Sequence, residues 1–215
     1  MKIKCSLVAS LLFILSAALL ATIYLIWMLY PLEIQWLRLE DVVYMEAREI
    51  GYNFNILLRY LTLPWVQELS MASFPSSASG LHHFQQVKWL FHLAQAIFLI
   101  SLLGFLYFWR RIVRKGYGNL YQTVFVAAAV LPILIGGFGV VVGFERFFTL
   151  FHQVLFVGDS SWLFNPHTDP VIYILPAEFF LHCFLLFFAL YESLCIGMVF
   201  ACHFKKNRIS AEKSF

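Results

Sequence analysis

Charged residues are scarce in this sequence: Asp, Glu, Lys and Arg together make up 13% of its 215 residues. Soluble domains carry about 25%. Hydrophobic residues account for 61%, and the mean hydropathy is +0.79. This composition excludes an ordinary soluble domain and predicts an integral membrane protein. The net charge of +3 is spread over short flanks of apolar segments, so no nucleic-acid partner is expected.

Motifs of metal, nucleotide and serine-hydrolase chemistry are also missing. The chain has no HExxH, no GxSxG, no glycine-rich phosphate loop and no Walker lysine. Its four cysteines form no CxxC pair and no zinc spacing, and all lie in or beside apolar segments. We interpret them as structural thiols in helices, and we expect neither a cofactor nor a bound metal.

Long apolar runs are what the sequence has instead. A helix needs about 20 apolar residues to cross a bilayer, and four runs meet this length. They cover residues 5–30, 89–109, 120–143 and 171–204. We therefore predict a single all-α membrane domain of four transmembrane helices, the first of them retained and not cleaved as a signal peptide.

Basic residues predict how these helices are oriented, because cytoplasmic loops are enriched in Lys and Arg. Most of them flank one side of a four-helix arrangement: Lys2, Lys4, Arg110, Arg111, Arg114, Lys115, Lys205, Lys206, Arg208 and Lys213. Fewer fall on the other side: Arg38, Arg48, Arg59, Lys88 and Arg146. This places both termini, the 110–119 loop and the 205–215 tail in the cytoplasm. Residues 32–87 and 144–170 are then extracytoplasmic and form a helical cap.

Local signals predict the helix ends. Pro31 is expected to end the first helix, and Asp41 to N-cap a helix that runs to about residue 61. Ser79 is expected to cap the helix that leads into the second span. Residues 144–156 are expected to extend the third helix beyond the membrane.

Residues 144–156, FERFFTLFHQVLF, concentrate polar groups in an apolar helix next to the bilayer. Glu145, Thr149 and His152 share one helical face, and Arg146 lies on the adjoining one. Such groups are costly at the membrane unless they face something polar. We expect this stretch to meet a second histidine, His83, at the same membrane surface.

Several short motifs occur in a specific order along nearly the whole chain. They are His-hydrophobic-x-polar-Val-Lys at residues 83–88, Phe-His with two later hydrophobic residues at 151–156, Trp162, Asp169, Pro-x-x-Phe-Phe at 176–180, and Tyr52 with the Tyr60-Leu61 pair upstream. With these motifs the sequence resembles the bacterial lipoprotein intramolecular transacylase family. It departs from that family's pattern at Gln86, where an aspartate is expected; if that carboxylate orients the histidine, another group must do so here.

The resemblance implies a reaction. An acyl chain moves from the sn-2 ester of a diacylglyceryl-modified N-terminal cysteine to the α-amine of the same cysteine, which gives an N-acyl, S-monoacylglyceryl lipoprotein. The partners implied are lipoprotein N-termini and membrane lipid. Histidine suits the two proton transfers that ester aminolysis needs. We expect His83 to be the general base and acid, and His152 a proton relay or a donor to the oxyanion.

Other polar groups are candidates for support of this site. Glu145 is placed to orient His152 or to pair with Arg146. Glu178 and His182 are four residues apart near the outer end of the fourth span, where they either support the site or join helices. The remaining histidines are interpreted as flanking, structural or incidental: His82, His92, His167 and His203. Asp169 is expected to cap the fourth helix, and Trp162 to anchor at the interface.

Two other classes of protein stay open. One is an intramembrane metalloenzyme that uses His83, His152 and Glu178. The other is a non-catalytic accessory protein that binds lipids or helices, in which the face formed by Gly136, Gly139 and Gly143 would matter more than any histidine.

Overall fold

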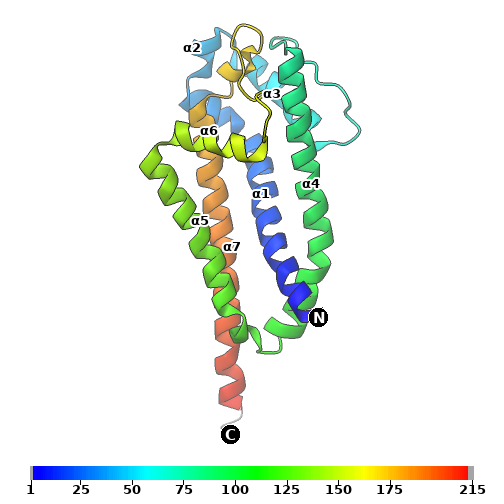
Figure 1. Cartoon of the computed structure of the whole chain (residues 1–215), viewed down its shortest axis with the longest axis vertical. Coiled ribbons are helices and arrows are strands. Elements are labelled where there is room, and N and C mark those ends of the chain that lie inside the picture. The colour runs from blue at the N-terminus through cyan, green and yellow to red at the C-terminus, as the bar shows by residue number, and fades with distance from the viewer. Residues whose placement is uncertain (1, 213–215) are drawn as a thin grey trace. The chain divides into compact units, whose positions relative to one another are not determined.

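The computed structural model describes residues 2–212, and side chains over residues 3–203. Every regular element in this part of the chain is a helix (Figure 1). In order they are α1 (Lys2–Trp36), α2 (Leu39–Val43), α3 (Ala47–Thr62), α4 (Ala78–Phe108), η1 (Trp109–Val113), η2 (Gly118–Leu120), α5 (Gln122–Val142), α6 (Phe144–Leu155), η3 (Pro170–Tyr173) and α7 (Ala177–Glu212). Four of them, α1, α4 with η1, α5 and α7, are long and apolar enough to cross a membrane. The all-α, four-span fold is confirmed.

The chain forms two compact units, and α1, α4 and α7 each contribute to both. Unit 1 comprises Met1–Thr22, Ala94–Val140 and Leu185–Phe215. Unit 2 comprises Ile23–Leu93 and Val141–Phe184.

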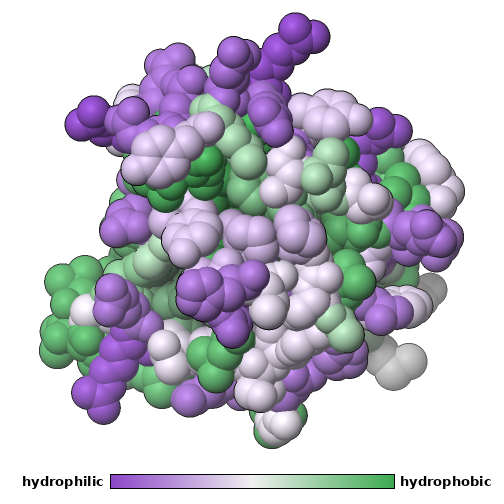
Figure 2. Space-filling view, turned by 90° about the horizontal axis from the view of Figure 1, so that it is seen from above, coloured by the Kyte–Doolittle hydropathy of each residue, from purple (hydrophilic) through white to green (hydrophobic). Residues whose placement is uncertain are grey.

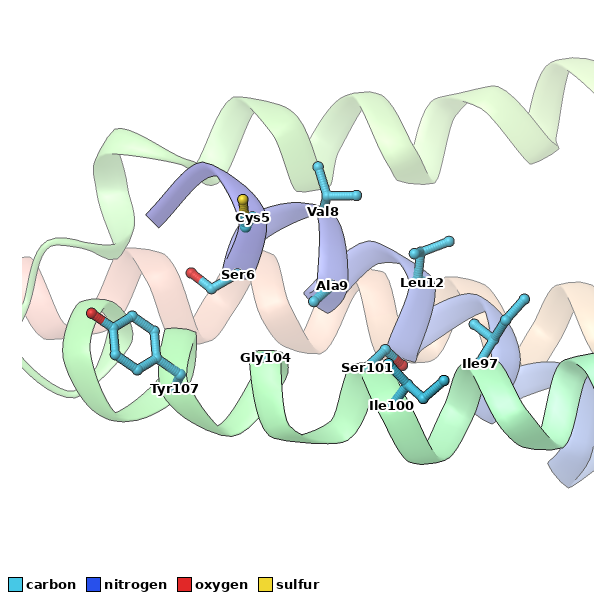
Figure 3. Close-up of a pocket in the computed structure, with 10 residues that line it drawn as sticks. All are labelled: Cys5, Ser6, Val8, Ala9, Leu12, Ile97, Ile100, Ser101, Gly104 and Tyr107. Atoms are coloured by element: carbon cyan, nitrogen blue, oxygen red, sulfur yellow. The ribbon is translucent and has the colours of Figure 1, made fainter. Parts of the chain in front are cut away.

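Unit 1 is built by helices that pack through an apolar core. Ten buried residues form it: Ile14, Ala18, Phe108, Ile112, Val113, Phe125, Tyr191, Cys195, Met198 and Cys202. Gly104 lets α1 and α4 approach closely, since a Cβ at this position would lie 2.4 Å from Ala9 Cβ. Beside this contact the two helices form an apolar groove, which is lined by residues such as Leu12 and Ile100 (Figure 3).

Unit 2 contains the short helices α2, α3 and α6 and the loops between them. Tyr30 of α1 stacks on Phe54 of α3 with 3.5 Å between ring centroids, and its hydroxyl donates to the Ile174 carbonyl at 2.8 Å. Phe179 of α7 packs edge-on against both rings. These contacts join α1, α3 and α7 within unit 2. Figure 2 looks onto this unit and shows hydrophilic side chains gathered around its edge, with apolar side chains among them.

Pro31 does not end the first helix, contrary to the prediction. It lies inside α1, which continues to Trp36. Its ring is on the exposed side, while its neighbours Tyr30 and Ile34 are buried. Packing on the opposite face therefore holds the helix together across the one backbone hydrogen bond that proline removes.

Three other predicted boundaries were wrong for local reasons. Asp41 lies within α2, since left-handed backbone at Arg38 and Tyr44 isolates this short helix, and α3 begins only at Ala47. At the start of α4, the side chain of Ser77 accepts the Gly80 amide at 3.0 Å, so Ser77 caps in place of Ser79. Gly143, with φ 83° and ψ 146°, separates α6 from α5, so residues 144–156 form an element of their own.

Candidate functional site

The site lies in unit 2, where α4 and α6 bring His83 and His152 together. The centroids of their rings are 5.9 Å apart. His83 is buried, with 7% of its surface exposed, and within the described residues its Nδ1 has no hydrogen-bond partner. A buried nitrogen without a partner requires an explanation, and a polar ligand in this site would supply one. The convergence predicted for these two histidines is present in the structure.

Aromatic rings enclose the pair. Phe156 and Phe164 pack edge-on against His83, with centroids at 4.8 and 5.5 Å. Phe148 and Trp162 lie 4.2 and 5.0 Å from the His152 ring. This surrounding disfavours the charged form of an imidazole, and burial lowers the pKa of His152 below its ordinary value, only partly offset by a hydrogen bond to the Phe148 carbonyl.

That hydrogen bond also fixes the tautomer of His152. Its Nδ1 is 2.9 Å from the Phe148 carbonyl oxygen. A carbonyl can only accept, so Nδ1 carries the hydrogen in the neutral ring. Nε2 is then the nitrogen with the free lone pair, and it is the atom of this ring that can accept a proton.

A carboxylate that was not predicted lies beside the pair. Asp159, in the loop after α6, accepts a hydrogen bond from Gln86 Nε2 at 2.6 Å, and its Oδ2 is 3.0 Å from His82 Nε2. Its Oδ1 accepts the backbone amide of Ser161 at 2.7 Å. Gln86, where an acid was expected, is therefore itself bonded to an acid. His82, interpreted as a flanking residue, belongs to this cluster.

Hydrogen bonds determine the charge of Asp159. Those from the backbone amide and side chain of Ser161, followed by those from Gln86 and His82, hold the pKa of this carboxyl well below its usual range. The only obvious signal for Asp159 in the sequence is its place in Gly-Asp-Ser-Ser. Such a stretch is also typical of an ordinary turn.

Several predicted supporting residues lie elsewhere. Glu145 and Arg146 are exposed, and the contact of His152 Nδ1 is with the Phe148 carbonyl, so Glu145 does not orient this histidine. The face of α6 that meets α7 is apolar, with Phe147 and Phe151 packed on Phe184. The polar face of α6 is consequently turned away from that contact.

The predicted Glu178–His182 pair is replaced by a pair between helices. His182 Nδ1 is 2.7 Å from Glu33 Oε2 of α1, whose residue is 3% exposed, while Glu178 is exposed. Glu33 is placed on the buried side of α1 beside Tyr30 and Ile34. This buried contact ties α7 to α1 within unit 2.

Two loop residues have roles other than those predicted. Asp169 does not cap the fourth helix: it accepts the Ser77 amide and hydroxyl, each at 2.8 Å, at the start of α4. Trp162 faces His152, and its indole nitrogen donates to the Asp159 carbonyl at 3.1 Å. Both residues therefore fasten the loop that covers the histidines.

The geometry does not provide the metal site that was left open. No group of three or more His, Cys, Asp and Glu side chains is arranged to hold an ion in the described residues. The exposed Glu178 is one of the three ligands that this alternative needs.

A four-span helical membrane protein with two histidines enclosed by aromatic rings is the class that fold and site define together. The family model of the lipoprotein intramolecular transacylase Lit matches residues 4–180. The chain belongs to this family, and it is therefore an acyltransferase. No match to a curated protein was found.

Solved structures of a member of this family have the same fold. The membrane-integral lipoprotein intramolecular transacylase of Bacillus cereus is 24% identical, with a TM-score of 0.82 over 98% of this chain and 96% of that one. A variant of it with a histidine-to-arginine substitution is 27% identical, with a TM-score of 0.76 over 97% and 93%. A histidine-to-alanine variant is 24% identical, with a TM-score of 0.74 over 100% and 94%.

Proposed function

We propose that this protein transfers an acyl chain within diacylglyceryl-modified lipoproteins of the bacterial cell membrane. The chain leaves the sn-2 ester of the S-diacylglyceryl group and joins the α-amine of the same N-terminal cysteine. The observation that carries the proposal is the approach of His83 and His152, in a chain that belongs to the transacylase family.

The chemistry is an ester aminolysis in which two protons move. The α-amine loses a proton as its nitrogen attacks the ester carbonyl carbon, and the glyceryl oxygen gains one as the carbon–oxygen bond breaks. A neutral imidazole accepts the first proton and donates the second. Since substrate amine and ester belong to one molecule, orientation in the site supplies much of the rate.

The two histidines have different surroundings, which supports a division of labour. His83 is the more buried and is assigned as general base and acid. His152, with Nδ1 held by the Phe148 carbonyl, presents Nε2 and is assigned as a relay for the proton or, when protonated, as a donor to the oxyanion. No serine or cysteine nucleophile is required by this route.

The orientation of the site in the membrane is part of the proposal. The distribution of basic residues supports a cytoplasmic location of both termini. Residues 32–87 and 144–170, which carry His83 and His152, then lie on the extracytoplasmic side.

Mass spectrometry of lipoprotein N-terminal peptides tests this function. A bacterial host without this activity would express the wild type, His83→Ala, His152→Ala or His167→Ala. We expect the wild type to give N-acyl, S-monoacylglyceryl peptides, and either site variant to lower the conversion rate by about 100-fold or more, the usual contribution of a general acid or base. His167, an exposed loop histidine, is the control and should behave as wild type.

Two results would contradict the proposal. If lipoproteins keep the diacylglyceryl form although the wild type is fully expressed, the result would favour an accessory protein that binds lipids or helices. Full activity of both site variants would remove the histidines from the mechanism.

A further inference from the structure

Asp159 is a charged group at the edge of the histidine pair that the proton transfers above do not use. Its carboxylate is held from three directions, by Ser161, by Gln86 and by His82. Its side chain is still 25% exposed, so part of it stays open to a ligand. The carboxylate is therefore fixed in place but is not closed off.

Asp159 lies near the groups that react in the proposed mechanism. It acts electrostatically on His83, and it belongs to the same loop as Trp162, whose ring packs on His152. The titratable group bonded to it is His82 of α4, and the next residue of this helix is His83, which in turn lies beside His152 of α6. Burial lowers the pKa of His152 below its ordinary value, so this ring does not offset the charge of the carboxylate at neutral pH.

We propose that Asp159 binds the α-ammonium group of the substrate's N-terminal cysteine before the proton is removed. The inference rests on the proposed function and adds a recognition site to it. An α-amine has a pKa of about 7.7–8.0 and is mostly charged at neutral pH. An ionised carboxylate that can only accept hydrogen bonds is a suitable partner for such a cation.

This role accounts for the proton balance of the whole reaction. The ammonium ion passes one proton to an imidazole, and the resulting amine forms the amide while a second amine proton reaches the glyceryl oxygen. One proton is thus released to solvent for every acyl chain transferred. Binding at Asp159 places the nitrogen beside the imidazoles that accept these protons, and it selects substrates whose α-amine is free.

The Michaelis constant for a synthetic diacylglyceryl-cysteine peptide tests the site, with purified full-length protein in detergent. At about pH 6.5 the substrate amine is charged, and at about pH 9 it is largely neutral. Loss of a charge-assisted hydrogen bond in Asp159→Asn should raise KM by about tenfold at the lower pH. At the higher pH the increase should be smaller than about twofold, because neutral amine gains little from a carboxylate. Asp159→Glu keeps the charge and should keep the wild-type dependence of KM on pH.

A control variant, and the results that would contradict the proposal, distinguish ammonium binding by Asp159 from the transacylase function on which it rests. Asp41→Asn makes the same chemical change at an exposed carboxylate of α2 and should leave both KM values unchanged. Asp159→Ser, which keeps an acceptor oxygen for the Ser161 amide, supplies the comparison if the asparagine variant does not accumulate. An equal rise of KM at both pH values, or no rise, would overturn ammonium binding while the transacylase function stands. An inactive wild type would overturn both.

Discussion

The Phe148 carbonyl distinguishes the two nitrogens of His152, because it contacts only Nδ1. Since Nδ1 is held as a donor, Nε2 is the nitrogen that the proposed mechanism uses. Burial lowers the pKa of the ring, so it stays neutral to a pH lower than a free histidine would. In the proposed mechanism, His152 is therefore neutral, and able to relay a proton, across the neutral pH range.

Trp162 should control the acid limb of the pH–rate profile. Its ring lies over His152, with 5.0 Å between the ring centroids, and Trp162→Ala would admit water to the imidazole. Better solvation favours the charged form, so the pKa of His152 should rise toward about 6.5 and the acid limb should move to higher pH. Rates measured with one synthetic substrate between about pH 5 and pH 8 would show this shift.

Trp162→Phe is the matched control, because a smaller ring still covers the histidine. Its acid limb should lie close to that of the wild type. An acid limb that stays in place in Trp162→Ala would mean that burial by this ring does not set the protonation of His152.

The predicted topology and the family resemblance together pointed to the two histidines of the candidate site but not to the carboxylate beside them. His83 and His152 each lie on a long helical pattern, and the predicted topology brought them to one surface. Asp159 lies in a loop, and its partner Gln86 is 73 positions away in the sequence. Local patterns carry no information about such a pairing. The same limit explains why His182 was assigned to Glu178 on its own helix and not to Glu33 on α1.

At the scale of elements, Gly143 decides where α5 ends and α6 begins. Its φ of 83° with ψ of 146° is a conformation that only glycine adopts readily. No atom lies within 4 Å of a Cβ built there, so a substitution would be opposed by backbone strain alone.

Gly143→Ala should lower the stability of the protein by about 1–3 kcal/mol, the cost of a strained backbone conformation. Gly137→Ala is the matched control: it lies inside α5, and a Cβ there also meets nothing within 4 Å. Alanine is the better helix former, so this control should be stabilised by about 0.5–1 kcal/mol. Thermal unfolding of both variants in the same detergent gives the comparison. Equal changes in the unfolding temperature of the two variants would show that a side chain at position 143 does not strain the backbone.

Hydropathy predicted the four spanning helices because a bilayer demands long apolar runs. The ends of the elements were harder to predict, since they depend on single residues in context. Pro31 is compatible with α1 because buried neighbours hold both sides of it. Gly143 was interpreted as part of a packing face, although its backbone conformation makes it a break. Short-range composition cannot distinguish these uses of proline and glycine.

At the scale of the whole molecule, the distribution of basic residues gives a prediction of membrane orientation. Single cysteines would be introduced as His167→Cys and Tyr117→Cys, both at exposed positions, in a chain whose four native cysteines have been replaced. A membrane-impermeant maleimide should label His167→Cys in intact cells. Tyr117→Cys should react only after the cells are permeabilised, because the 110–119 loop is expected in the cytoplasm. The opposite labelling pattern would invert the orientation and place the histidines on the cytoplasmic side.

The loop between α6 and α7 is fastened near both of its ends. Asp159 is bonded to Gln86 of α4, and Asp169 to Ser77 at the start of the same helix. The nine residues between the two aspartates must therefore span a set distance along α4, and a deletion would pull one carboxylate from its place. Asn165–Thr168, within this span, is exposed and turns back on itself, with the Asp169 amide bonded to the Asn165 carbonyl at its base. An insertion inside this turn can extend outward without lengthening the path between the two aspartates. An epitope tag inserted between Pro166 and His167 should leave the protein active.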